Sequence, residues 1–310
     1  MKFASRNRLF AAFTLFVTVL MSSTMRSLIA YALNTEHTHA SQIVLIPFIS
    51  AALIYFNRKN IFRDIHCSVT PALLVLVLGL GLFVCGKIVG GGLEEGDYLS
   101  LMTSSVVVLW LGGFLLFYGT TAFRTAIFPL LFLCFFIPIP GPILSRAITV
   151  LQRGSAELSY LFLKVSGTPV LRESLYVMRL PDLVIQVAPE CSGIRSGISL
   201  LICSLLAGHL FLRSTWRRAL LVIAVIPVLI LKNALRIGTL SYLAVHVDQR
   251  ILTSELHREG GIPFFVLALF LLYPILALLI KSESRKADTA SGTPLKLSPA
   301  AVSNTDSGHF

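Results

Sequence analysis

Residues 187–196 read Val-Ala-Pro-Glu-Cys-Ser-Gly-Ile-Arg-Ser, a short polar stretch at the start of an apolar run that reaches residue 212. That run is about as long as the roughly 20 residues that cross a bilayer as a helix. A thiol, a glycine turn and an arginine at the mouth of such a helix indicate chemistry at the edge of a membrane. The stretch therefore predicts a membrane-spanning fold and marks a candidate site within it.

The rest of the chain extends this pattern. Hydrophobic residues make up 55% of the 310 residues and charged residues only 13%, which is about half the usual share in soluble proteins. The sequence predicts an all-α polytopic membrane protein with about eight transmembrane helices. We expect these spans near residues 9–33, 40–56, 70–89, 98–119, 122–138, 192–212, 219–243 and 262–280.

The basic residues indicate the orientation of the spans. The net charge of +11 does not predict nucleic-acid binding, because Lys and Arg gather in short clusters between apolar runs, as they do in cytoplasmic membrane loops. With eight spans, the N-terminal tail, the clusters at 58–63 and 213–218, Arg124 and the C-terminal tail all fall on one side. We therefore expect both termini in the cytoplasm and an uncleaved first span in a cell (inner) membrane.

The segment 139–191 is expected to lie outside the membrane, at its surface. Prolines at 138, 140 and 142 break the preceding helix. Residues 143–165 read as an amphipathic helix, and 170–187 read as a small hairpin with a Pro181-Asp182 turn. The chain as a whole is expected to have two parts. These are a transmembrane domain over 1–285 and a disordered cytoplasmic tail over 286–310, which is rich in Ser, Thr, Pro and Ala.

Cys191 is the first candidate for a site residue. It stands at the expected external end of the sixth span, where free N–H groups and the positive end of the helix dipole favour a thiolate. The same N–H groups are suited to hold an oxyanion. The cysteines at 85, 134 and 203 are expected to be buried and structural, and Cys67 an ordinary loop thiol. Because no CxxC or metal-ligand spacing occurs, the sequence suggests no metal or organic cofactor.

Arg236 and His257 complete the candidate site. Arg236 lies about 25 Å along the seventh span, close to the external face, with Asn233 one turn earlier on the same side. An ionised residue at this depth is costly and usually functional. His257 precedes the last span and is suited to move protons, with His246 as its competitor. Lys232 is expected only to extend its ammonium group to the membrane interface.

These motifs resemble those of the exosortase/archaeosortase family. The stretch 187–196 resembles that family's cysteine motif, Asn233-Ala234-Leu235-Arg236-Ile237 its arginine motif, and His257 with Gly260 and Gly261 its histidine motif. The histidine favours the bacterial exosortase branch. The resemblance covers roughly residues 40–280.

The resemblance implies a multispanning membrane cysteine transpeptidase or protease. Cys191 would be the nucleophile, Arg236 would stabilise charge, and His257 would act as acid and base. The implied partners are membrane-anchored proteins with a C-terminal sorting signal, built of a short motif, an apolar helix and a basic tail. The lipid bilayer is the other implied partner.

Two other function classes stay open at this point. A secondary transporter or carrier of lipid-linked precursors would use Arg236 to bind an anion and would not need the thiol. A structural scaffold of an envelope assembly would need no reactive cysteine at all. The sequence leaves the cognate substrate, the acceptor nucleophile and the oligomeric state open.

Overall fold

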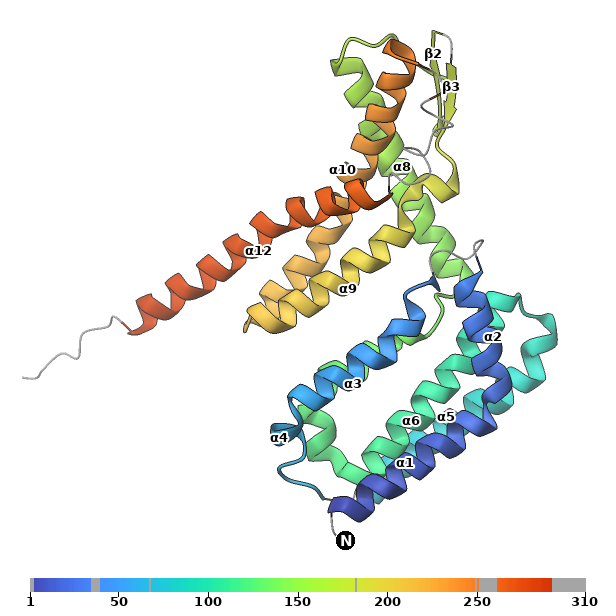
Figure 1. The fold of residues 1–310 in the computed structure, drawn as a ribbon, viewed down its shortest axis with the longest axis vertical. Helices are drawn as coiled ribbons and strands as arrows, with labels where there is room; N and C mark the ends of the chain where they lie inside the picture. The colour runs from blue at the N-terminus through green and yellow to red at the C-terminus, as the bar shows by residue number, and fades with distance from the viewer. Residues whose placement is uncertain are drawn as a thin grey trace, which may run out of the picture.

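The computed structural model describes residues 3–34, 40–66, 68–181, 183–248, 250 and 261–291. Its N-terminal half consists of α1 (Phe3–Leu20), α2 (Ser22–Leu33), η2 (Ile43–Leu45), α3 (Ile46–Phe56), α4 (Arg58–Ile61), α5 (Val69–Val89), η3 (Gly90–Gly92), α6 (Glu95–Thr125), α7 (Ile127–Phe132) and η4 (Leu133–Phe136). The C-terminal half consists of α8 (Gly141–Val165), β1 (Leu171–Arg172), β2 (Val177–Leu180), β3 (Leu183–Gln186), η5 (Pro189–Ser192), α9 (Ile194–Phe211), α10 (Thr215–His246) and α12 (Gly261–Ser291) (Figure 1).

The helices confirm the prediction of an all-α polytopic membrane protein. Five helices in the described part of the chain are long and apolar enough to cross a membrane, and two bent pairs raise this number to at most seven. The shorter apolar helix over Ile43–Phe56 stands outside that count. The expected number of eight spans is therefore not confirmed by length and composition.

The first expected span, over residues 9–33, falls on a bent pair of helices. α1 and α2 meet at Met21 with a bend of 73°. α1, α2, α4, α5 and α7 all contact α6, whose Phe114 is among the largest fully buried side chains of the described residues. Rings from α1, from α6 and from Phe62, which directly follows α4, pack edge-on or tilted against one another here, including Phe10 and Tyr118.

The second bent pair separates the two halves of the molecule. The helix pair Ile127–Phe136 and Gly141–Val165 is bent by 89°, which confirms the predicted break at the prolines. The N-terminal end of α6 holds this corner in place. Gly141 N donates to Asp97 Oδ1 at 2.7 Å, and Ser100 Oγ donates to Pro138 O at 2.8 Å. A carboxylate at the start of α8 also complements the positive end of its dipole.

α8 and a small sheet form a cap on the helices, which Figure 1 shows at the upper right. β2 and β3 pair antiparallel with Leu180 opposite Leu183, as the predicted hairpin requires. β1 adds a third strand, in the order β1-β2-β3. Met178, Leu180 and Val187 pack with α8 residues in one buried cluster. Arg172 of β1 donates two bonds of 2.7 Å to the Glu157 carboxylate on α8.

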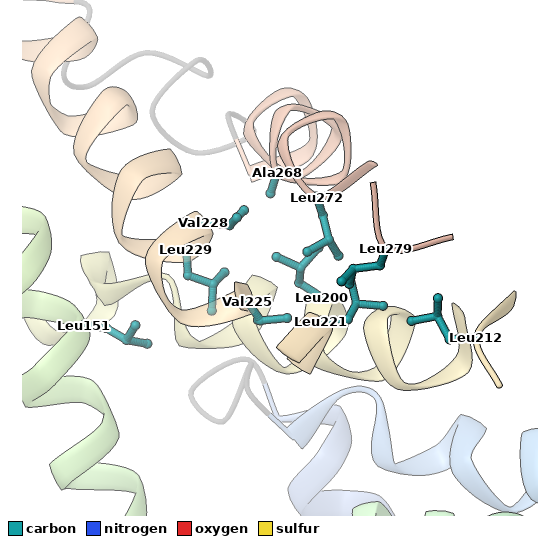
Figure 2. Packing of buried hydrophobic residues seen from close by; sticks show 10 residues of the cluster. All are labelled: Leu151, Leu200, Leu212, Leu221, Val225, Val228, Leu229, Ala268, Leu272 and Leu279. Atoms are coloured by element: carbon teal, nitrogen blue, oxygen red, sulfur yellow. The ribbon is translucent and has the colours of Figure 1, made fainter. Parts of the chain in front are cut away.

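α9, α10 and α12 form the last helix group. Their contacts are almost purely aliphatic, as Figure 2 shows for a cluster that includes Leu200 of α9, Leu221 and Val225 of α10, and Leu272 of α12. Because lipid tails are as apolar as leucine, such contacts hold membrane helices together by close packing rather than by removal from water. α10 contacts both α9 and α8, so it joins this group to the cap.

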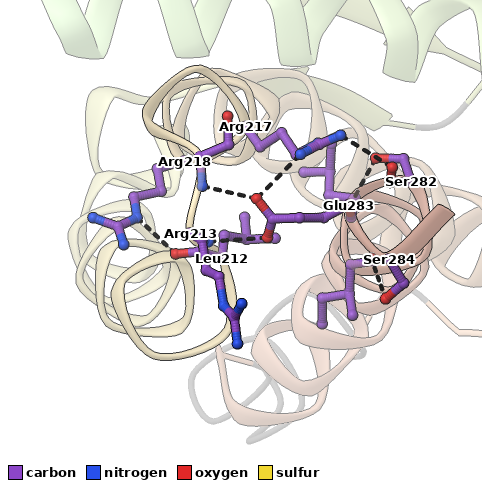
Figure 3. Close-up of polar contacts among 10 residues, drawn as sticks. Leu212, Arg213, Arg217, Arg218, Ser282, Glu283 and Ser284 are labelled. Carbon is purple, nitrogen blue, oxygen red and sulfur yellow. Dashed lines mark hydrogen bonds and ion pairs between the residues drawn. The ribbon is translucent and has the colours of Figure 1, made fainter. Parts of the chain in front are cut away.

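One polar contact fixes the end of this group that lies farthest from the cap. The Glu283 carboxylate of α12 accepts bonds from Arg213 N at 2.9 Å and Ser214 N at 2.8 Å, where α10 begins (Figure 3). Arg217 Nη1 donates to the same carboxylate at 3.1 Å. This ion pair and helix cap tie α12 to the α9–α10 turn. α12 continues to Ser291, beyond the predicted domain boundary at residue 285.

Candidate functional site

The cysteine motif folds as a single tight turn. η5 begins at Pro189, and the fixed φ of a proline suits the first turn of a helix. Cys191 lies within η5, and its side chain is outside the described part of the structure. Gly193 then adopts φ 78° and ψ 16°, a left-handed conformation that favours glycine. α9 starts directly after it at Ile194, so the cysteine precedes the N-terminal end of a helix, as predicted.

The turn is braced from within α9. Ser196 Oγ donates to Gly193 O at 2.9 Å, and Gly197 N donates to the same carbonyl at 2.9 Å. The N–H groups at the start of an α-helix have no partner within it. The first turn of α9 therefore presents donors and a positive dipole end next to the thiol-bearing turn.

α10 brings the arginine motif against this turn. A Cβ built on Gly193 would lie 3.4 Å from Asn233 Oδ1 and 3.5 Å from Lys232 Nζ. Arg236 follows Asn233 by three residues on the same helix and is half-buried. The cysteine and arginine motifs, about 40 residues apart in the sequence, are thus neighbours in space.

α8 is the third element of the site, after the cysteine turn and α10. Its residues were not singled out from the sequence. Gln152, Ser155 and Ser159 lie on one buried face of the helix. Gln152 Nε2 donates to Val187 O, just before the cysteine turn, and Asn233 Nδ2 donates to Ser155 Oγ at 3.1 Å. Ser159 Oγ donates to Ala234 O at 3.2 Å. These bonds orient α10 and the cysteine turn relative to one another.

Glycines let α8 and α10 approach closely enough for these bonds. A Cβ on Gly238 of α10 would lie 2.4 Å from Phe162 Cδ1, and one on Gly154 of α8 would lie 2.9 Å from Ile230 Cδ1. Small residues at helix crossings are the usual means by which membrane helices pack closely.

Lys232 is a polar residue of this site whose role the sequence missed. The prediction that its ammonium group extends to the interface is wrong, because the residue is 2% exposed. Lys232 Nζ instead donates to Ser196 Oγ at 2.7 Å, across the gap between α10 and α9. Ser192, one residue after the cysteine, is 1% exposed, and its Oγ has no partner among the described residues. The signal in the sequence was a lysine beside Asn233 within an apolar span.

The structure describes two of the histidines considered for the site, His246 and His209, but not His257. His257 lies outside the described residues, so its assignment stays a prediction. His246 is exposed at the end of α10, stacked on the Tyr242 ring at 4.2 Å. Ten residues of helix separate it from Arg236, about 15 Å of rise. His209 of α9 stacks on Phe128 at 3.7 Å.

The other cysteines differ from expectation in burial. Cys85 and Cys134 are exposed rather than buried, and Cys203 is half-buried. Both exposed thiols lie on elements of apolar sequence. Cys67 is outside the described residues. Within the part of the chain that the structure describes, no three His, Cys, Asp or Glu side chains gather as a metal site requires.

Of three comparisons with known proteins, the one with protein-family models gives a match. The sequence model of the transmembrane exosortase family (Exosortase_EpsH) matches residues 33–274. Neither the curated proteins nor the solved structures contain a match to the chain. The matched region begins at the end of α2 and ends within α12, so it includes every motif of the candidate site. The chain belongs to the transmembrane exosortase family.

Proposed function

We propose that this protein is a membrane-embedded cysteine transpeptidase or protease that cleaves the C-terminal sorting signal of exported proteins through a thioester on Cys191. Membership of the transmembrane exosortase family supports a transpeptidase or protease-like role in a membrane. The observation that supports the finer proposal most strongly is the contact between the thiol-bearing turn and α10. Gly193 meets Asn233 there, one turn before Arg236.

The proposed reaction has two steps. The Cys191 thiolate attacks a peptide carbonyl, and the N–H groups at the start of α9 and the Arg236 guanidinium stabilise the oxyanion. The C–N bond breaks, His257 gives a proton to the leaving amine, and the substrate's membrane anchor departs. An amine, a lipid headgroup or water then attacks the thioester and restores the thiol.

The surroundings of the site favour this chemistry. Gln152, Ser155, Ser159 and Asn233 are each at most 8% exposed, so the polar groups are held in a region of low dielectric. Fixed dipoles and charges act more strongly there than in water. We infer that the site faces the exterior, or periplasm, of a cell (inner) membrane, because the basic residues Arg213, Arg217 and Arg218 lie at the opposite end of α9 and α10, and basic loops gather in the cytoplasm.

Replacement of Cys191 tests the proposal. Cys191→Ala and Cys191→Ser should abolish processing of a membrane-anchored substrate while membrane levels of the protein stay normal. Processing is measured as the size shift of the substrate on immunoblots of the same cells. Variants in which Cys85, Cys134 or Cys203 is replaced by Ser are the matched controls and should process normally. Normal processing by Cys191→Ala would instead support a carrier in which Arg236 binds an anion.

A further inference from the structure

We propose that Lys232 is a positioning residue of this site, which holds the turn bearing Cys191 and keeps that thiol ionised. The inference rests on the proposed function, since it assigns Lys232 to the same thiol. It goes beyond the cysteine, arginine and histidine motifs, because Lys232 precedes the arginine motif and was expected only to extend to the membrane surface.

The first argument is burial. Lys232 is 2% exposed, and it is one of the largest fully buried side chains of the described chain. A lysine in the interior of a membrane protein is expensive and is seldom retained without a task. A buried charge costs free energy because it has lost its hydration, and an apolar side chain of similar size would avoid that cost. Its presence therefore points to function rather than to stability.

The second argument is the path from Lys232 to the thiol-bearing turn. Lys232 Nζ donates to Ser196 Oγ at 2.7 Å, and Ser196 Oγ donates to Gly193 O at 2.9 Å. Gly193 is two residues after Cys191 and joins η5 to α9. Its left-handed φ sets the angle between these two elements. The lysine thus fixes the carbonyl on which the orientation of η5 depends.

The third argument is charge. Within the described part of the chain Lys232 forms no ion pair. Arg236 lies one turn further on α10, and Arg195 is an exposed residue of α9. On α8, Arg153 is exposed and the Glu157 carboxylate is bound to Arg172. The turn itself carries Glu190, whereas the charged residues that the start of α9 and the adjoining part of α10 contribute, Arg195, Lys232 and Arg236, are all positive. Positive charge beside a thiol stabilises its thiolate.

The test measures the reactivity of Cys191 in the intact protein. Cys67, Cys85, Cys134 and Cys203 are replaced by Ser, and the purified protein is labelled with a water-soluble maleimide between pH 6 and 10. In this background Lys232→Met should label at least tenfold more slowly at pH 7, with its midpoint moved to higher pH. Its melting temperature should stay equal or rise, because a buried charge has been removed.

Two further variants separate charge from position. Lys232→Arg keeps the charge and should retain the low labelling midpoint. Ser196→Ala keeps the charge but removes the bond to the turn, so it should slow substrate processing while moving the midpoint less than Lys232→Met does. Lys87→Met, which removes an exposed lysine from α5, is the matched control and should change neither readout.

The outcomes distinguish the two proposals. A Lys232→Met variant with an unchanged labelling profile and normal processing refutes the role of Lys232, and leaves the proposed function intact if Cys191→Ala is inactive. A lower melting temperature with unchanged labelling also refutes it, since that shows a structural role alone. If Cys191→Ala still processes substrate, the proposed function fails, whatever the labelling of Lys232→Met shows.

Discussion

Gly193 decides how the thiol meets the arginine motif. Its φ of 78° costs an L-residue with a side chain about 1–2 kcal/mol. A Cβ there would be in ordinary van der Waals contact with Asn233 Oδ1 at 3.4 Å and Lys232 Nζ at 3.5 Å. The requirement for glycine is therefore a backbone requirement, and the same distances show that the turn lies directly against α10.

Replacing Arg236 and replacing His257 are expected to impair substrate processing in different ways. Arg236→Lys keeps a positive charge but loses the planar fork of donors, so processing should be severely impaired. His257→Ala should lower the rate by about 10²–10⁴, the usual weight of acid–base catalysis, with partial recovery at high pH as more thiolate forms. Initial rates of processing between pH 6 and 9 check both.

His246→Ala is the control for this pair. His246 lies at the exposed end of α10 beside Tyr242, so its replacement should lower the rate of processing only mildly. An inactive His246→Ala together with a normal His257→Ala would transfer the role of base to His246 and leave the thiol chemistry untouched.

At the scale of single residues, sequence reasoning found the motifs but missed their support. Cys191, Asn233 and Arg236 stood out because polar groups are rare within apolar runs. Gln152, Ser155 and Ser159 did not, because polar residues on an amphipathic helix look the same whether they face water or a buried partner. Cys85 and Cys134 were expected inside, yet apolar surroundings in a bilayer include the lipid-facing surface itself.

At the scale of elements, the strongest signals were those with a backbone cause. Prolines predicted the sharp corner before α8, and the corner is bent by 89°. The hairpin was predicted with its turn, but β1 has only two residues, too few for a periodic pattern. The 73° bend at Met21 has neither proline nor glycine beside it; Arg26 interrupts the apolar run there, but it does not mark the residue at which the helix bends.

The crossing of α8 and α10 gives the element-scale prediction. A Cβ on Gly238 would lie 2.4 Å from the Phe162 ring, so Gly238→Leu must separate the helices or displace the ring. Such overpacking costs about 1–3 kcal/mol, and the hydrogen bonds from Asn233 to Ser155 and from Ser159 to Ala234 should lengthen. We expect a lower melting temperature in detergent and slower processing.

Gly81→Leu is the matched control, because nothing lies within 4 Å of a Cβ at that position of α5. It should leave melting and processing unchanged. Equal losses in both variants would mean that any leucine in a membrane helix is harmful, and that the α8–α10 crossing has no special part.

At the scale of the whole molecule, the number of crossings decides the topology. Five long helices, or seven with the bent pairs, would place the two termini on opposite sides. Counting the short helix over Ile43–Phe56 as a crossing gives eight and returns both termini to one side. α3 packs against α7 and η4, so three short elements lie together, which suits a bilayer that is locally thinned.

We expect α3 to cross, because its end leads directly to Arg58, Lys59 and Arg63. An external position for this cluster would contradict the usual gathering of basic loops in the cytoplasm. A reporter active only outside the cytoplasm should therefore be silent when fused after residue 64 or 285 and active after residue 93. Activity after 64 would show that α3 turns back within the membrane. Activity after 285 would invert α12 and, with it, the side on which the site is proposed to lie.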